Sequence, residues 1–136
     1  MRYLAIDYGS KRLGLAHCDP GETIVSPLCQ LSIPAAGAKK VIGKLQEVIR
    51  ENQIEAIVIG LPLNMDGSAG PQAQTTKSFA KLLSDSVDIP VHLQDERLSS
   101  AAADYLLDET GFTNKKRKAR RDMLAACDIL HEFLGR

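Results

Sequence analysis

Hydrophobic and polar positions alternate with the period of a β-strand in the first part of the chain. Side chains in residues 2–8 fall alternately on the two sides of a strand, and Asp7 lies on one of these sides near the strand's end. Two further β-rich stretches, 13–18 and 22–33, are separated by the turn sequence Asp19-Pro20-Gly21. The pattern predicts an antiparallel meander of three strands.

A helix and a buried strand are expected next. Residues 36–52 carry apolar side chains at helical spacing, among them Val41 and Leu45, while lysine and glutamate occupy the rest of the helical wheel. Residues 54–61 form a nearly continuous apolar run rich in branched side chains, which is typical of a strand buried on both faces. We therefore expect an amphipathic helix and then a strand near the centre of the sheet.

The remainder of the chain alternates helix and strand. The pattern predicts a helix over 71–86, a strand over 91–94, and helices over 99–109 and 119–134. Strands followed by helix and strand in alternation are typical of an α/β domain with a mixed sheet. With 136 residues, 44% of them hydrophobic, the chain is expected to form one domain, residues 1–136, in which helices flank a mixed five-stranded sheet.

Composition excludes several classes of protein. Lys plus Arg and Asp plus Glu number 17 each, so the chain has no net positive charge that would indicate a nucleic-acid partner. Local clusters of charged residues must be considered instead. The cysteines are odd in number and lack CxxC spacing, which argues against a disulfide framework or a zinc site; they are Cys18, Cys29 and Cys127. Without a leader-like or bilayer-spanning apolar stretch, the protein is expected to be cytoplasmic and to make no membrane contact.

Asp7 begins the sequence DYGSKRLG, in which a carboxylate at a strand end is followed by a glycine turn and by Lys11 and Arg12. Such a turn can present backbone N–H groups and positive charge to a phosphate beside a metal-binding carboxylate. A simpler interpretation is that Asp7 only caps the turn. We favour the functional one because a carboxylate on an apolar strand costs free energy unless a partner compensates it.

The last predicted helix contains two aspartates on different faces. Asp122 shares the apolar side with Ala126 and Ile129, whereas Asp128 points away from it. One explanation for Asp122 is its place in the first helical turn, where a carboxylate interacts favourably with the helix dipole. Because that interaction does not require the core-facing side, we consider Asp122 a candidate site residue.

The segment Asp95-Glu96-Arg97 ends the last predicted strand and offers two more carboxylates. Neighbouring residues on a strand face opposite ways, so one of the two is expected to share a face with Asp7. The pattern does not decide which one. A surface ion pair between Asp95 and Arg97 is an equally good interpretation.

The segment GLPLNMDGSAGPQAQ is a long exit from a buried strand, at the end where α/β sheets bind ligands. It lacks the Gly-Lys-Ser/Thr ending of a Walker A loop. Its polar side chains could contact a backbone phosphate or a ribose; they are Asn64, Asp66, Ser68 and Gln72. A glycine-rich turn without chemistry explains the segment equally well.

Six of the seven residues from Lys115 to Arg121 are Lys or Arg in an otherwise neutral chain. Such a run is usually a solvated face or a flexible loop. Close to a carboxylate site it could bind a polyanion, and the candidates for this contact are Lys115, Lys116, Arg117 and Lys118. Aromatic residues make up 4% with no Trp, so recognition of the nucleic-acid backbone is favoured over base stacking.

Four of these segments together resemble a known family. DYGSKRLGLA at 7–16, IGLPLNMDGSAGPQAQ at 59–74, DERLSS at 95–100 and DMLAACDILHEFL at 122–134 resemble the YqgF family of pre-16S rRNA nucleases and Holliday junction resolvases, nearly end to end. The resemblance implies a ribonuclease H-like fold and processing of the 5′ end of the 16S ribosomal RNA precursor. It also implies Asp7, Glu96 and Asp122 as the acidic site residues, and so favours Glu96 over Asp95.

These residues suggest a specific chemistry. Three carboxylates are expected to hold Mg²⁺ or Mn²⁺ for phosphodiester hydrolysis, while Lys11, Arg12, Arg97 and the basic segment contact the nucleic acid. One alternative is a resolvase for branched DNA, which requires a symmetric dimer; monomer and homodimer both stay open. Another is an RNA-binding factor for ribosome assembly that catalyses no reaction.

Overall fold

The computed structural model describes residues 1–9, 11–35, 37–96 and 114–135, with side chains of the last range described from residue 124 onward. Along the chain the elements are β1 (Tyr3–Tyr8), β2 (Arg12–Cys18), β3 (Val25–Ser32), α1 (Lys39–Glu51), β4 (Ala56–Leu61), α2 (Pro71–Ser86), β5 (Val91–Asp95) and α4 (Asn114–Phe133). The helix expected over 99–109 lies outside the described residues. The other expected elements are present: α2 has the expected bounds, and the others have shifted ends.

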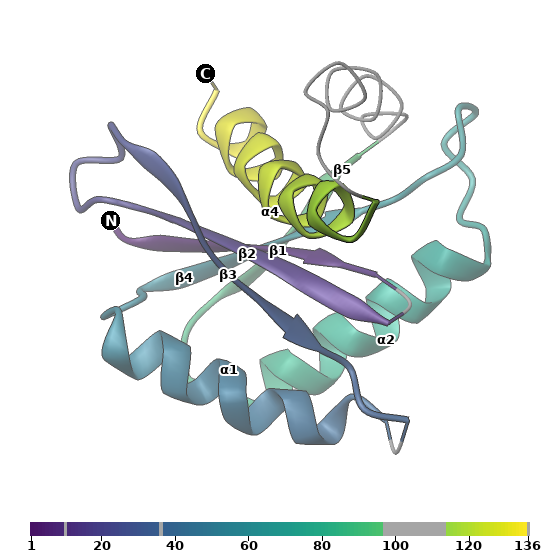
Figure 1. Ribbon diagram of the computed structural model, residues 1–136, viewed down its shortest axis with the longest axis horizontal. Helices are drawn as coiled ribbons and strands as arrows, with labels where there is room; N and C mark the ends of the chain where they lie inside the picture. Colours follow the sequence, from purple (N-terminus) through teal and green to yellow (C-terminus); the bar gives the residue numbers. More distant parts are fainter. Residues whose placement is uncertain (10, 36, 97–113, 136) are drawn as a thin grey trace.

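The five strands form one mixed sheet in the order β3-β2-β1-β4-β5 (Figure 1). β1 pairs antiparallel with β2, and β2 with β3, which confirms the predicted meander. β4 pairs parallel with both β1 and β5, so β4 is an interior strand and β1 is the middle one. Because β1, β4 and β5 run in the same direction, their carboxyl ends share one edge of the sheet.

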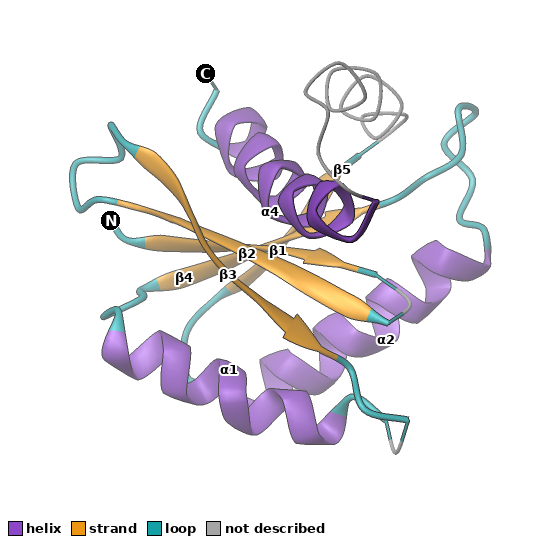
Figure 2. Cartoon of the chain, in the orientation of Figure 1, coloured by secondary structure: helices purple, strands orange, loops and turns teal. Residues whose placement is uncertain are grey.

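One face of the sheet is covered by α1 and α2 (Figure 2). The alternation in β1 sends Leu4 and Ile6 to this face, where they pack with the apolar stripe of α1. Phe79 of α2 belongs to the same core, and its ring stacks on that of Tyr8 with centroids 4.2 Å apart. The larger hydrophobic core therefore lies on the side away from Asp7.

The opposite face is covered by α4 alone among the described helices (Figure 2). On this face the strands carry small side chains, including Ala5 and Ala16, which pack against Ala126 and Leu130 of the helix. The ring of Tyr3 meets that of Phe133 edge-on, with centroids 5.2 Å apart. The beginning of β1 thus contacts the C-terminal end of α4. The N-terminal part of α4 lies toward the carboxyl end of β1 (Figure 1).

The boundary of α4 differs from the prediction. The helix begins at Asn114 instead of residue 119, so the basic segment is helical backbone and not a loop before the helix. Lys and Arg are good helix formers, and a solvated charged stretch can continue an amphipathic helix beyond its apolar stripe. The apolar periodicity used for the prediction could not detect this extension.

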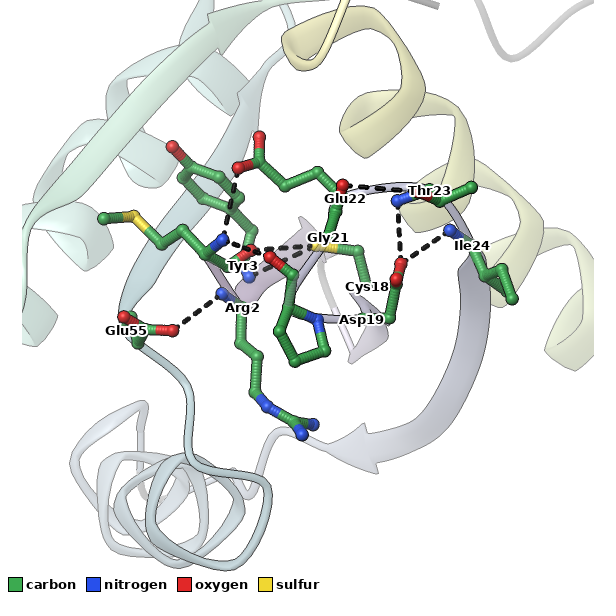
Figure 3. Close-up of polar contacts among 11 residues, drawn as sticks. Arg2, Tyr3, Cys18, Asp19, Gly21, Glu22, Thr23, Ile24 and Glu55 are labelled. Carbon is green, nitrogen blue, oxygen red and sulfur yellow. Dashed lines mark hydrogen bonds and ion pairs between the residues drawn. The ribbon is translucent and has the colours of Figure 1, made fainter.

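The turn between β2 and β3 explains a second shifted boundary (Figure 3). Asp19 Oδ1 accepts hydrogen bonds from the backbone N–H groups of Ile24, at 2.6 Å, and Thr23, at 2.7 Å. These bonds hold the pKa of Asp19 below its usual value. They also keep residues 19–24 in the turn, so β3 starts at Val25 and not at the expected residue 22.

Two further features concern the cysteines and the helices. All three cysteines are free. Within the described ranges, no helix combines the length and apolar character needed to cross a bilayer.

Candidate active site

Asp7 lies near the end of β1. It shares a face with Ala5, two residues before it, and therefore lies on the side covered by α4, opposite Leu4 and Ile6. Its side chain is half-buried. The strand then turns sharply: the Gly9 N–H donates to the Arg12 carbonyl at 2.8 Å. A Cβ at residue 9 would lie 2.6 Å from that oxygen, so this turn requires glycine.

The two cations after this turn differ in position. Arg12 begins β2 and shares the α4 face with Gly14 and Ala16, and Gly14 pairs directly with Asp7. Arg12 is half-buried, and by alternation it lies on the same face of the sheet as Asp7. Lys11 is exposed, and its backbone carbonyl accepts from the Ile33 N–H at 2.8 Å.

Glu96 lies immediately after β5 at the shared carboxyl edge. Its N–H donates to the Leu61 carbonyl at 2.9 Å, which extends the pairing of β4 and β5 by one step. The residue is 9% exposed. Its Cγ lies 3.1 Å from the position that a Cβ of Gly60 would occupy. The Glu96 side chain therefore leans over β4, toward the strand that carries Asp7.

This geometry separates the two neighbouring carboxylates. His92 is on the α4 face, because its ring meets that of Phe133 with centroids 5.3 Å apart. By alternation Glu96 shares this face, and Asp95, which is exposed, points to the other one. Asp7 and Glu96 therefore lie on the same face of the sheet, which the strand pattern alone could not predict.

The third candidate, Asp122, is part of the α4 backbone, but its side chain lies outside the described ones. Asp128 of the same helix is exposed, as expected from the helical wheel. Among the side chains that the structure describes, no three of His, Cys, Asp or Glu are grouped to hold a metal ion. The side chain of Asp122 is not among them.

The loop after β4 has an internal network that the sequence did not reveal. Asn64 Nδ2 donates to Ser68 Oγ at 2.9 Å, and Ser68 donates to Asp66 Oδ1 through its backbone N–H at 2.9 Å and its hydroxyl at 2.6 Å. Gln72 Nε2 donates to the Tyr8 carbonyl at 3.1 Å, joining α2 to the end of β1. These four candidate substrate contacts therefore shape the loop at the carboxyl edge.

The remaining predicted contacts lie outside what is described. Arg97 is outside the described residues, and the side chains of the basic segment, Lys115 to Lys118 included, are outside the described side chains of α4. Sequence reasoning missed two residues on the site face, Gln94 and Gly60, which pair directly. The available signal was a glycine inside a buried strand, which often marks a close approach of another element.

The fold defines a class of protein. The structure resembles Thermus thermophilus RuvC in complex with a Holliday junction substrate, with TM-score 0.57 and 12% identity over 99% of this chain and 97% of that one. It also resembles the fowlpox virus resolvase in complex with Holliday junction DNA, with TM-score 0.54 and 10% identity over the full length of both chains. The chain therefore has the ribonuclease H-like fold of the junction resolvases.

The sequence then identifies the family. Residues 1–136 match the family model of RuvX, described as Holliday junction resolvase, and the chain belongs to this family. A Syntrophomonas wolfei relative is 41% identical over 98% of this chain and 94% of its own length. A Maridesulfovibrio salexigens relative is 40% identical over 100% and 99%. Both carry the provisional name of pre-16S rRNA nuclease, and the resemblance to the YqgF family is confirmed.

Proposed function

We propose that this protein is a metal-dependent endonuclease that hydrolyses phosphodiester bonds in pre-16S rRNA, near the 5′ end of the mature sequence. One observation carries the proposal. Asp7 and Glu96 lie on one face of the sheet, at the edge where β1, β4 and β5 end, and Glu96 leans toward the strand of Asp7. Ligand sites of α/β sheets are found at such edges.

Asp122 is the proposed third carboxylate. The contact of Tyr3 with Phe133 relates the two elements. From there Asp7 is about 13 Å along β1, and residue 122 is about 16 Å back along α4, by the standard rise of a strand and a helix. Asp122 also precedes Ala126 by four positions and Ile129 by seven, the spacing of one helix face. These relations support a place for Asp122 above the end of β1.

The donor set fits Mg²⁺ or Mn²⁺, because carboxylate oxygens are the ligands that these hard cations prefer. Asp7, Glu96 and Asp122 would hold the ion or ions, which when bound act as Lewis acids on the phosphate. The chain itself supplies the rest of the site. The Arg12 guanidinium would offset phosphate charge beside Asp7, and the low exposure of Glu96 would limit competing water.

The proposed substrate follows from the relatives and from charge. Proteins about 40% identical to this chain carry the name of pre-16S rRNA nuclease. The basic segment would contact the RNA backbone by displacing counterions, so binding should weaken steeply as salt is added. Lys115, Lys116, Arg117 and Lys118 are the proposed contacts, together with Lys11 and Arg97.

A cleavage assay with matched substitutions tests the proposal. The purified protein is incubated with Mg²⁺ or Mn²⁺ and either pre-16S rRNA fragments or four-way DNA junctions. Asp7→Asn and Glu96→Gln should each reduce cleavage by about a thousandfold, since loss of several kcal/mol of charge stabilisation is expected. Asp95→Asn, on the opposite face, should keep at least half of the activity.

A second pair of substitutions tests the proposed carboxylate of α4. Asp122→Asn should abolish cleavage, while Asp128→Asn on the exposed side of α4 should not. Wild-type cleavage that survives in Asp7→Asn, or that is indifferent to chelation, contradicts the site. RNA binding that persists in chelator and in all three site variants, without any cleavage, would instead favour a non-catalytic assembly factor.

The alternative substrate is branched DNA, and the family description and the shared resolvase fold favour it. A resolvase must cut two strands of a junction, which requires a symmetric dimer with two sites. Cleavage of four-way junctions in preference to pre-rRNA, by a protein that sediments as a dimer, would establish this alternative.

A further inference from the structure

Gly60 lies where three parts of the candidate site meet. It is a buried residue of β4, paired with Gln94 of β5, one position beyond the last pair that joins β4 to β1. A Cβ at this position would lie 2.5 Å from Ile129 Cδ1, 2.9 Å from Ile129 Cγ1 and 3.1 Å from Glu96 Cγ. Carbon atoms in good contact are about 3.5–4.0 Å apart, so each of these neighbours would have to move to admit a side chain.

The space above Gly60 is therefore shared by the side chains of Ile129 and Glu96. Ile129, 3% exposed, enters it from α4, and Glu96, 9% exposed, enters it from the end of β5. The first contact determines how closely α4 approaches the sheet. The second lies on the path by which Glu96, two strands away from β1, reaches toward Asp7.

We propose that Gly60 is a positioning residue of the carboxylate site. Its missing side chain leaves the space through which Glu96 crosses β4, and an added methyl group pushes the Glu96 carboxylate away from Asp7. The inference rests on the proposed function, in which these two side chains hold a divalent cation. Gly60 touches neither ion nor substrate; it acts through Glu96.

The difficulty is that Gly60→Ala also collides with Ile129, so a loss of activity alone could reflect a displaced helix. The two effects separate if Gly60→Ala is made in two backgrounds. With Ile129 in place, the new methyl group meets both neighbours. In an Ile129→Ala background the contacts with Cγ1 and Cδ1 are gone, whereas the contact with Glu96 Cγ remains. Gly43→Ala in α1 is the matched control, since no atom lies within 4 Å of its added Cβ.

Four measurements are made on each variant. Thermal unfolding reports the packing of α4. Titration with Mn²⁺ alone reports the carboxylate site without substrate. The ¹³C resonance of the Glu96 carboxyl group, assigned with Glu96→Gln, reports its surroundings without metal. The kcat and KM of cleavage complete the set.

With Ile129 in place, Gly60→Ala should lower the unfolding midpoint, and in the Ile129→Ala background it should not. In both backgrounds it should shift the Glu96 resonance and weaken Mn²⁺ binding severalfold. The kcat should fall by about threefold to tenfold with little change in KM, because the contact at 3.1 Å requires Glu96 to yield by a few tenths of an ångström and a misplacement of about 1 Å costs about a hundredfold. Gly43→Ala should change none of these quantities adversely.

If the resonance shift and the loss of Mn²⁺ affinity vanish in the Ile129→Ala background, Gly60 only seats the helix and the proposal is overturned. An unshifted Glu96 resonance in Gly60→Ala overturns it as well, whether or not the wild type cleaves nucleic acid. Failure of the proposed function has a different signature, namely a wild type that neither binds Mn²⁺ nor cleaves.

Discussion

Ile129→Ala is predicted to be among the most destabilising single substitutions on α4. The side chain is 3% exposed and rests directly on Gly60. The substitution removes three carbons, worth about 0.8 kcal/mol each by transfer. A cavity adds to this, because the small residues of the sheet face offer little that could fill it, so a loss of about 3–4 kcal/mol is expected.

The magnitude can be checked by heat and by urea. For 136 residues the unfolding entropy is about 0.29 kcal/mol/K, so a loss of about 3 kcal/mol lowers Tm by about 10 °C. The urea midpoint should fall at unchanged m-value. Ile24→Ala deletes the same atoms from a side chain that is 63% exposed, and it should cost less than about 0.5 kcal/mol. Equal losses for the two variants would refute the account of how α4 packs.

Three further outcomes follow from the described contacts. Because the backbone N–H groups of Ile24 and Thr23 lower the pKa of Asp19, its contribution to stability is complete above the unfolded pKa of about 3.9 and is lost as the pH falls through the lower folded value. Urea midpoints of wild type and Asp19→Asn should therefore differ at pH 7 and converge near pH 2; a constant gap contradicts this. Burial raises the pKa of the Cys127 thiol to about 11, so alkylation at pH 8 should be far slower in the native protein than in guanidinium, and equal rates would disprove the burial. Gly9→Ala should destabilise by about 1–3 kcal/mol in urea titrations, because its Cβ meets a backbone oxygen, whereas Gly43→Ala should be neutral or stabilising; the opposite order contradicts the turn.

The local parts of this protein were predictable from its sequence. The alternation in β1 placed Asp7 on the face opposite Leu4 and Ile6, and the helical spacing placed Asp128 away from the core. Both results need only the period of a strand or a helix, which depends on neighbouring residues. The meander was predictable for the same reason, since a short turn leaves adjacent strands no other simple pairing.

Other features required the tertiary structure. Nothing local distinguishes Glu96 from Asp95 as the partner of Asp7, because the choice depends on how β5 pairs with β4. The polar side chains of the loop after β4 suggested contacts with substrate, and only the folded loop shows Ser68 bonded to Asp66.

Gly60 makes the same point about the site itself. It has no side chain to signal a role, and its importance arises from Ile129 and Glu96, which are distant in sequence and meet above it. Sequence periodicity determined which face of each element is apolar. Strand pairing and helix approach, which are contacts between distant segments, decided which carboxylate joins Asp7.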